Sequence, residues 1–167
     1  MTSPAGQGAA PAIQSARLPA QYRRRARRAD VTPASCNVEG PARWQTDLVM
    51  LRCMIVDDDA SFLKAAQTLL ESDGVTVAGV ASTGADAVER VGVLRPDVVL
   101  IDIRLGQESG FDVARQLAAN GQAAALIMIS THAQEDYADL IAESPVIGFV
   151  PKVELSASAI RRVLGMR

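Results

Sequence analysis

The chain has 167 residues, of which 49% are hydrophobic and 22% charged, and its formal net charge is −2. This length and composition are typical of a globular protein with one buried core. No apolar stretch approaches the roughly 20 residues that span a bilayer, and no apolar run of signal-peptide length follows the N-terminus. We therefore find neither a membrane signal nor an export signal.

Residues 1–49 differ in character from the rest of the chain. They hold five of the eight prolines and seven Arg against three acidic residues, whereas residues 50–167 carry ten Lys and Arg against sixteen acidic residues. Because Pro, Ala, Gly and Arg dominate the first segment without periodicity, we expect a disordered extension. Its basic run at 22–28 could bind nucleic acid or anionic lipid, although a solvated tail is favoured. Alternatively, translation begins at Met50, where globular patterning starts abruptly.

The two cysteines do not suggest a disulfide framework. Cys36 lies in a Pro- and Ala-rich stretch, and Cys53 lies inside an apolar run of strand length. This usage favours a reducing, cytoplasmic setting.

From residue 51 onward, five short apolar runs alternate with five longer amphipathic stretches. The predicted strands are 51–56, 75–80, 98–101, 124–129 and 146–150. The predicted helices are 60–72, 84–94, 110–119, 134–142 and 155–164. This alternation argues for right-handed βαβ units and a parallel sheet covered by helices on both faces, which also explains strands that are apolar throughout.

Acidic side chains follow two of the predicted strands. Asp57 and Asp58 come directly after the first strand, and Asp102 follows the third. Because ligands bind outside the carboxyl ends of the strands in such sheets, we expect these carboxylates to converge if the two strands are neighbours. They would repel one another without a hard divalent cation, and their oxygen ligands suit Mg²⁺. Asp59 is instead expected to be the N-cap of the first helix.

The last two strands add other functional groups to the same edge. The fourth ends at Ser130 and Thr131, and the fifth leads through Phe149 to Lys152. A hydroxyl and an ammonium group are thus predicted beside the carboxylates.

With these positions in order, residues 50–167 resemble the receiver domain of bacterial two-component response regulators. The resemblance implies a flavodoxin-like, doubly wound α/β fold with five parallel strands in the order 2-1-3-4-5. It implies that Asp102 is the phospho-acceptor. It also implies that Asp57, Asp58 and Asp102 bind Mg²⁺ together with the main-chain carbonyl of Arg104.

The same resemblance gives roles to three further residues. Ser130 matches the switch hydroxyl, Lys152 matches the lysine of the phosphorylation site, and Phe149 matches the switch aromatic. For Phe149 a plain core role remains an equal alternative. Phosphorylation would let Ser130 bond to the phosphoryl group and let Phe149 turn inward, which biases a two-state surface.

The sequence departs from the family pattern at three positions. Gly106 stands where the family has a proline, which suggests a more mobile loop. Val153 follows Lys152 in place of the common proline, so no cis peptide bond is expected there. Ser130 replaces the more frequent threonine. None of these changes removes a required functional group.

Two loop residues invite a further hypothesis. His132 is expected to be an exposed loop residue, as is Thr131, and a relay role for a lone histidine is disfavoured. By resemblance, however, His132 occupies the place two residues past the switch hydroxyl, where the family tunes the lifetime of the phosphoryl group. We hypothesise that Arg104 and His132 tune it here.

The sequence thus predicts a non-enzymatic receiver that takes a phosphoryl group from a histidine kinase or phosphotransfer protein and contacts a downstream effector protein through residues 134–155. The chain stops at Arg167, after the last predicted helix, so we expect no DNA-binding domain in it and no membrane partner. Two alternatives stay open. One is a metal-dependent phosphohydrolase, because Asp57 and Asp59 have the Asp-x-Asp spacing of that class. The other is a degenerate receiver that acts as an interaction module without phosphorylation.

Overall fold

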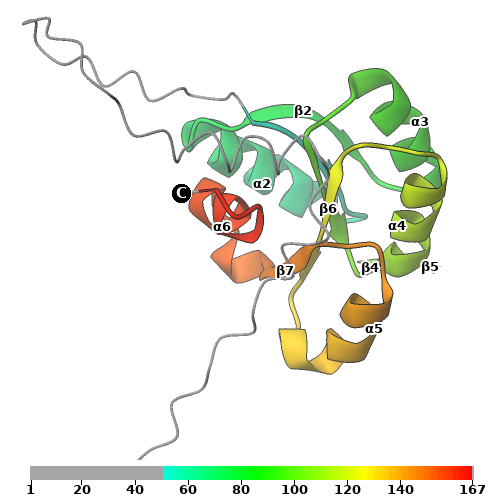
Figure 1. Cartoon of the computed structure of the whole chain (residues 1–167). Helices are drawn as coiled ribbons and strands as arrows, with labels where there is room; N and C mark the ends of the chain where they lie inside the picture. The colour runs from blue at the N-terminus through cyan, green and yellow to red at the C-terminus, as the bar shows by residue number, and fades with distance from the viewer. Residues whose placement is uncertain (1–50, 167) are drawn as a thin grey trace, which may run out of the picture.

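The computed structural model describes residues 51–166, and its centre is one five-stranded parallel sheet (Figure 1). The strands are β1 (Arg52–Val56), β2 (Thr76–Ala81), β3 (Val98–Asp102), β6 (Ala125–Ser130) and β7 (Gly148–Pro151). Their order is β2-β1-β3-β6-β7, and every neighbouring pair is parallel. This is the predicted 2-1-3-4-5 order, so the flavodoxin-like α/β fold is confirmed. The predictions for residues 1–49 and for a start at Met50 lie outside the described residues.

Helices cover both faces of the sheet, as predicted. They are α2 (Ala60–Ser72), α3 (Gly84–Leu94), α4 (Gly110–Ala119), α5 (Ala138–Glu143) and α6 (Ala157–Val163). Figure 1 shows α2 and α6 on one side of the sheet and α3 and α4 on the other. In the part of the chain that the structure describes, none of these helices is long and apolar enough to cross a membrane.

The central strands are buried on both faces, which explains their lack of alternation. All five residues of β3 and all six of β6 are buried. Leu100 belongs to the core under α2 and α6, while its neighbour Ile101 belongs to the core under α3 and α4. Each such side chain contributes roughly 1.5–3 kcal/mol through burial. The sheet edge that carries the polar residues is thus held between two apolar layers.

Side-chain caps fix where helices begin at this edge. The carboxylate of Asp59 accepts hydrogen bonds from the backbone N–H groups of Ser61 (2.8 Å) and Phe62 (3.2 Å), as predicted for an N-cap. The hydroxyl of Thr83 accepts one from the N–H of Asp86 (3.3 Å) at the start of α3. Such caps satisfy donors that have no partner inside the helix.

The structure differs from the predicted elements in two places. A short antiparallel hairpin, β4 (Arg104–Leu105) with β5 (Glu108–Ser109), occupies what was predicted as a loop. Gly106 lies in its turn with φ +59°, a conformation that proline cannot adopt because its ring holds φ near −65°. This geometry accounts for glycine in place of the family's proline. The fourth predicted helix also begins as a 3₁₀ turn, η2 (Gln134–Tyr137). A further 3₁₀ turn, η3 (Lys152–Glu154), precedes the fifth predicted helix, where α6 starts only at Ala157.

Candidate functional site

Three carboxylates meet at the carboxyl edge of the sheet. β1 and β3 are neighbours, with Val56 in register with Ile101, so the residues that follow them lie side by side. One oxygen from each of Asp57, Asp58 and Asp102 lies within 4.8 Å of the others. Asp57 is fully buried and Asp102 is 6% exposed, whereas Asp58 faces solvent. The structure therefore brings together the acidic residues that the sequence singled out.

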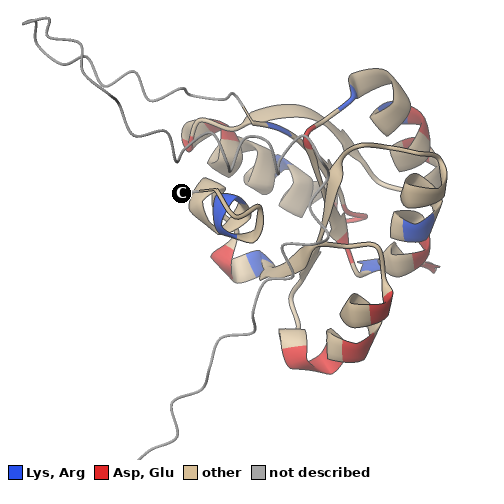
Figure 2. Ribbon diagram, in the orientation of Figure 1, with Lys and Arg blue, Asp and Glu red and all other residues tan. Residues whose placement is uncertain are grey.

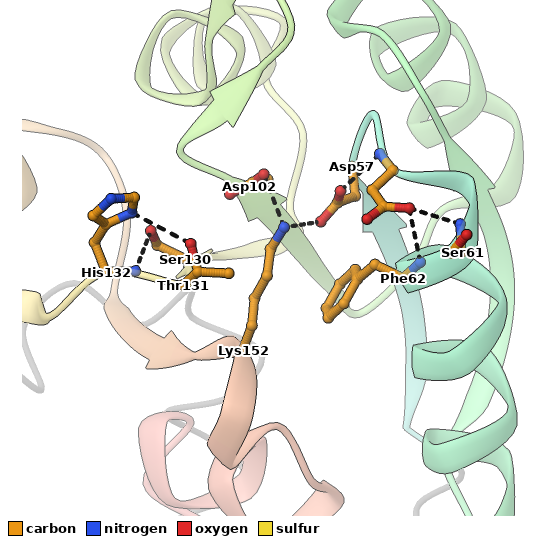
Figure 3. A network of polar contacts seen from close by, with 9 residues as sticks. Asp57, Ser61, Phe62, Asp102, Ser130, Thr131, His132 and Lys152 are labelled. Atoms are coloured by element: carbon orange, nitrogen blue, oxygen red, sulfur yellow. Dashed lines mark hydrogen bonds and ion pairs between the residues drawn. The ribbon is translucent and has the colours of Figure 1, made fainter.

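Lys152 reaches this cluster from the end of β7, an edge strand of the sheet. Its Nζ lies 2.6 Å from Oδ2 of Asp57 and 2.9 Å from Oδ2 of Asp102 (Figure 3). The lysine follows β7, which is separated from β3 by β6, so its long side chain crosses the edge to reach both acids. Only 11% of that side chain is exposed. A buried ammonium thus bridges two buried carboxylates.

The electrostatics of the cluster follow from burial and pairing. Burial raises the pKa of Asp57 above its ordinary value, and the ammonium of Lys152 and the backbone N–H of Asp59 only partly oppose it. Burial acts to lower the pKa of Lys152, but its pairing with Asp57 and Asp102 outweighs this and the pKa is raised. Lys152 is therefore charged at neutral pH.

The donor set fits a hard divalent cation. Among the described residues, Oδ2 of Asp57 accepts no hydrogen bond of ordinary geometry, although it is buried and paired in charge with Lys152. A buried oxygen of this kind needs a further positive partner. Asp57 and Asp102 offer buried carboxylate oxygens, and Asp58 offers an exposed one. Because the site is open to solvent at Asp58, it leaves room for the water ligands that Mg²⁺ retains.

A small pocket opens on the other side of Asp102. It has a volume of about 260 Å³ and is lined by Asp58, Asp102, Arg104, Gly106, Ser130, Thr131 and His132. Ser130 is 2% exposed, and its Oγ accepts a hydrogen bond from the backbone N–H of His132 (3.1 Å). The His132 residue is exposed, with Nδ1 at 3.3 Å from Oγ1 of Thr131, and its ring is nearly perpendicular to that of Tyr137. The Asp102 carboxylate is thus accessible from solvent through this pocket.

Phe149 does not line that pocket. It lies on β7 opposite Met128, is 7% exposed and packs in the core under α3 and α4. The structure thus places this ring in the core, and its switch role stays a prediction.

Three features of the site were not found from the sequence. The Phe62 ring lies against the Lys152 ammonium, and Oε2 of Glu108 accepts a hydrogen bond (3.1 Å) from the N–H of Gly84 at the start of α3. In addition, Gly110 sits so close to Asp102 that a β-carbon there would overlap its main-chain carbonyl. Of these three features, only the position of Glu108 had a signal in the sequence. That signal was Gly106, because a glycine is typical of the tight hairpin turn that precedes Glu108.

Comparison with known proteins matches this chain to one family. The family model for the response regulator receiver domain matches residues 53–163. The chain is 38% identical over 86 residues to a protein-glutamate methylesterase/protein-glutamine glutaminase of Symbiobacterium thermophilum, which covers 51% of this chain and 24% of that protein. It is 23% identical over 137 residues to the transcriptional regulatory protein PdtaR of Mycobacterium tuberculosis, covering 76% of this chain and 66% of the relative. The chain therefore spans between a quarter and two thirds of these relatives.

Solved structures agree with the fold. The signal receiver domain of the putative response regulator NarL from Mycobacterium tuberculosis superimposes with a TM-score of 0.61 at 26% identity, covering 69% of this chain and 97% of that one. The response regulator domain of Thermotoga maritima CheB gives a TM-score of 0.59 at 22% identity, with 71% and 98% covered. The second likeness, at this identity, concerns the fold alone.

Proposed function

The chain belongs to the response regulator receiver domain family, and from this premise we propose that it is a phospho-accepting switch whose acceptor is Asp102. The phosphoryl donor is a histidine kinase or a phosphotransfer protein. The readout is a change in the surface that a downstream effector protein contacts.

The observation that carries this proposal is the position of the Lys152 ammonium between two buried carboxylates. A single acidic strand end is common, but an ammonium within 3 Å of Asp57 and Asp102 is an arrangement suited to phosphoryl transfer. The charge on the transferring phosphoryl oxygens needs positive groups fixed close to the acceptor.

The chemistry follows from these contacts. Oδ2 of Asp102 is held by Lys152, which leaves the other carboxylate oxygen to attack phosphorus, while the bond from phosphorus to the donor breaks. Asp57, Asp58, Asp102 and the main-chain carbonyl of Arg104 would hold Mg²⁺, which when bound neutralises charge on the phosphoryl oxygens. Lys152 then pairs with the phosphoryl group attached to Asp102.

The switch is proposed to begin at Ser130. Its buried hydroxyl accepts a bond from His132 N–H, so the O–H remains able to donate to a phosphoryl oxygen on the neighbouring strand. A shift of Ser130 toward the phosphoryl group would pull the loop that follows β6, and with it η2 and α5, toward Asp102. Phe149 could then repack into the space that this loop leaves. This is a bistable element biased by one added charge.

The proposed effector surface is the segment from 134 to 155. Acidic residues recur along η2 and α5 and colour this part of the ribbon red in Figure 2. They are the exposed residues Glu135, Asp136, Asp139 and Glu143, and Leu140 among them is 49% exposed. An effector with basic groups around an apolar contact would complement this surface. The expectation of a cytoplasmic setting is part of the same proposal and rests on the cysteine pattern.

The test is phosphorylation by a small-molecule donor. The purified chain and Asp102→Ala are incubated with acetyl phosphate, with Mg²⁺ or with EDTA, and intact mass is measured. We expect one added phosphoryl group in the wild type with Mg²⁺ and none in Asp102→Ala or in EDTA.

Other outcomes point to the other classes. A wild type that binds Mg²⁺ but gains no mass would be a degenerate receiver acting as an interaction module. Continuous hydrolysis of a phosphomonoester that requires Asp57 would favour the phosphohydrolase.

A further inference from the structure

The ammonium of Lys152 has a third neighbour besides the two carboxylates. Its Nζ lies 4.4 Å from the centroid of the Phe62 ring. Figure 3 shows the ring beside the end of the lysine side chain, on the side opposite Ser130 and His132. The ammonium is therefore enclosed by two acids and one aromatic face.

The place of the ring is set independently of the lysine. Phe62 lies in the first turn of α2, where its N–H is bonded to the N-cap Asp59. Its side chain is half-buried and packs against the core under α2 and α6. Because backbone capping and core packing hold the ring, it can act as a fixed wall for a flexible neighbour.

The lysine side chain gains more from a fixed neighbour than the shorter side chains of the site do. Its ammonium is a point charge on a stem of four carbons, and ordering this stem costs side-chain entropy. A cation over an aromatic face within about 6 Å of the centroid is attracted by the ring, and more strongly when water is excluded. Here the lysine side chain is 11% exposed, so the contact is largely desolvated.

We propose that Phe62 is a positioning residue for phosphoryl transfer, whose ring face holds the Lys152 ammonium over Asp57 and Asp102. The inference rests on the proposed function and adds a residue to it. A neutral ring attracts the ammonium without competing as a third carboxylate would, so Lys152 stays free to move onto the phosphoryl oxygens. The ring also keeps water from the α2 side of the ion pairs.

The rate of phosphorylation tests the positioning role. With acetyl phosphate and Mg²⁺, Phe62→Leu should lower the second-order rate constant by about 2- to 30-fold, the range of a cation–π contact. Phe62→Tyr, which keeps the ring face, should retain most of the wild-type rate. Leu69→Ala is the matched control, because Leu69 lies on the same helix and is 43% exposed.

Electrostatics can be separated from packing by ring fluorination. Phenylalanines that carry increasing numbers of ring fluorines, placed only at position 62, weaken the negative face with little change of shape. The rate constant should fall in steps with fluorine content. A purely structural ring would leave the rate constant level across the series, and that result would overturn the proposal even if Phe62→Leu fails to fold.

A second readout does not depend on phosphorylation. In NMR spectra of the unphosphorylated protein, the ring current should shift the terminal methylene protons of Lys152 upfield in the wild type and in Phe62→Tyr, but not in Phe62→Leu. The shift of the urea midpoint caused by Phe62→Leu should also be smaller in a Lys152→Met background.

The two proposals fail in different ways. A wild type that gains no phosphoryl group contradicts the proposed function. A wild type that gains it, with Phe62→Leu reacting at the same rate or with Lys152 protons at the same positions, contradicts only the role of Phe62.

Discussion

Asp57 combines complete burial with a negative charge, and this makes protein stability depend on pH and on metal. Because its pKa is raised in the folded state, the folded protein holds a proton that the unfolded chain has already lost. The stability that this proton confers is complete below the ordinary pKa of aspartate. It is lost as the pH rises through the raised value.

We therefore predict that, in EDTA, the free energy of unfolding of the wild type falls relative to that of Asp57→Asn as the pH rises above the ordinary aspartate value of 3.8. The slope for one proton is at most about 1.4 kcal/mol per pH unit. Urea unfolding at a series of pH values measures it.

Mg²⁺ should reverse this difference, because a cation bound to the folded state stabilises only the variant that can hold it. Equal pH dependence of the two proteins in EDTA would contradict the burial argument. Equal stabilisation of both by Mg²⁺ would place the cation elsewhere.

Arg104 and His132 both line the pocket that leads to Asp102. Both are exposed, so neither should matter for folding, but both stand where water must pass to hydrolyse an acyl phosphate. We expect Arg104→Ala and His132→Ala each to change the rate of dephosphorylation several-fold, with free energies of unfolding within about 0.5 kcal/mol of the wild type. Loss of the added mass over time measures the rate, and unchanged rates in both variants would sink the hypothesis.

Gly110 links the proposed phosphorylation site to helix α4. It begins this helix, its N–H donates to the carbonyl of Ile103 (2.9 Å), and a β-carbon there would also lie 2.9 Å from the carbonyl carbon of Asp102. The overlap is with backbone, so no side chain can turn away to relieve it.

Gly110→Ala should therefore push α4 from the end of β3, destabilise the protein by about 1–3 kcal/mol and slow phosphorylation of Asp102. Gly92→Ala is the matched control, because its new methyl would meet only Gln122 at 3.8 Å. Gly92 lies in the last turn of α3, where replacing glycine by alanine should stabilise the protein by up to about 1 kcal/mol. Urea unfolding and acetyl phosphate kinetics of both variants check this, and a Gly110→Ala protein with wild-type behaviour would contradict the close approach.

The elements and the convergence of the acidic residues were predictable from the sequence, because long apolar runs mark the strands and their polar ends share one side of a parallel sheet. Short elements and individual side-chain contacts were not. The five strands and the edge that carries Asp57, Asp102 and Lys152 follow from apolar runs that end in polar residues. The β4–β5 hairpin escaped because strands of two residues have no periodicity to detect. The contact between Phe62 and Lys152 could not be predicted, since the two residues are distant in sequence and only the fold brings them together.

Strand β1 pairs with β2 and β3, and its side chains pack in the cores on both faces of the sheet, so the whole domain relies on it. Cys53 pairs in register with Val77 of β2 on one side and Val98 of β3 on the other, and it is fully buried. Burial raises the pKa of its thiol far above the usual range, which disfavours the reactive thiolate in the folded state. Exposing this thiol requires β1 to leave the sheet, which amounts to unfolding the domain.

We predict that, in a Cys36→Ser background, an alkylating reagent modifies Cys53 between about 10³- and 10⁸-fold more slowly than a free thiol, in proportion to the unfolding equilibrium. The control is Val93→Cys with Cys53→Ala, since Val93 is 78% exposed on α3 and should react at nearly the rate of a free thiol. A free energy from labelling well below that from urea unfolding would mean that β1 opens locally. If β1 opens only when the whole domain unfolds, Mg²⁺ bound beside the end of β1 should slow labelling of Cys53. The labelling rate should fall by the same factor by which Mg²⁺ lowers the equilibrium constant of unfolding.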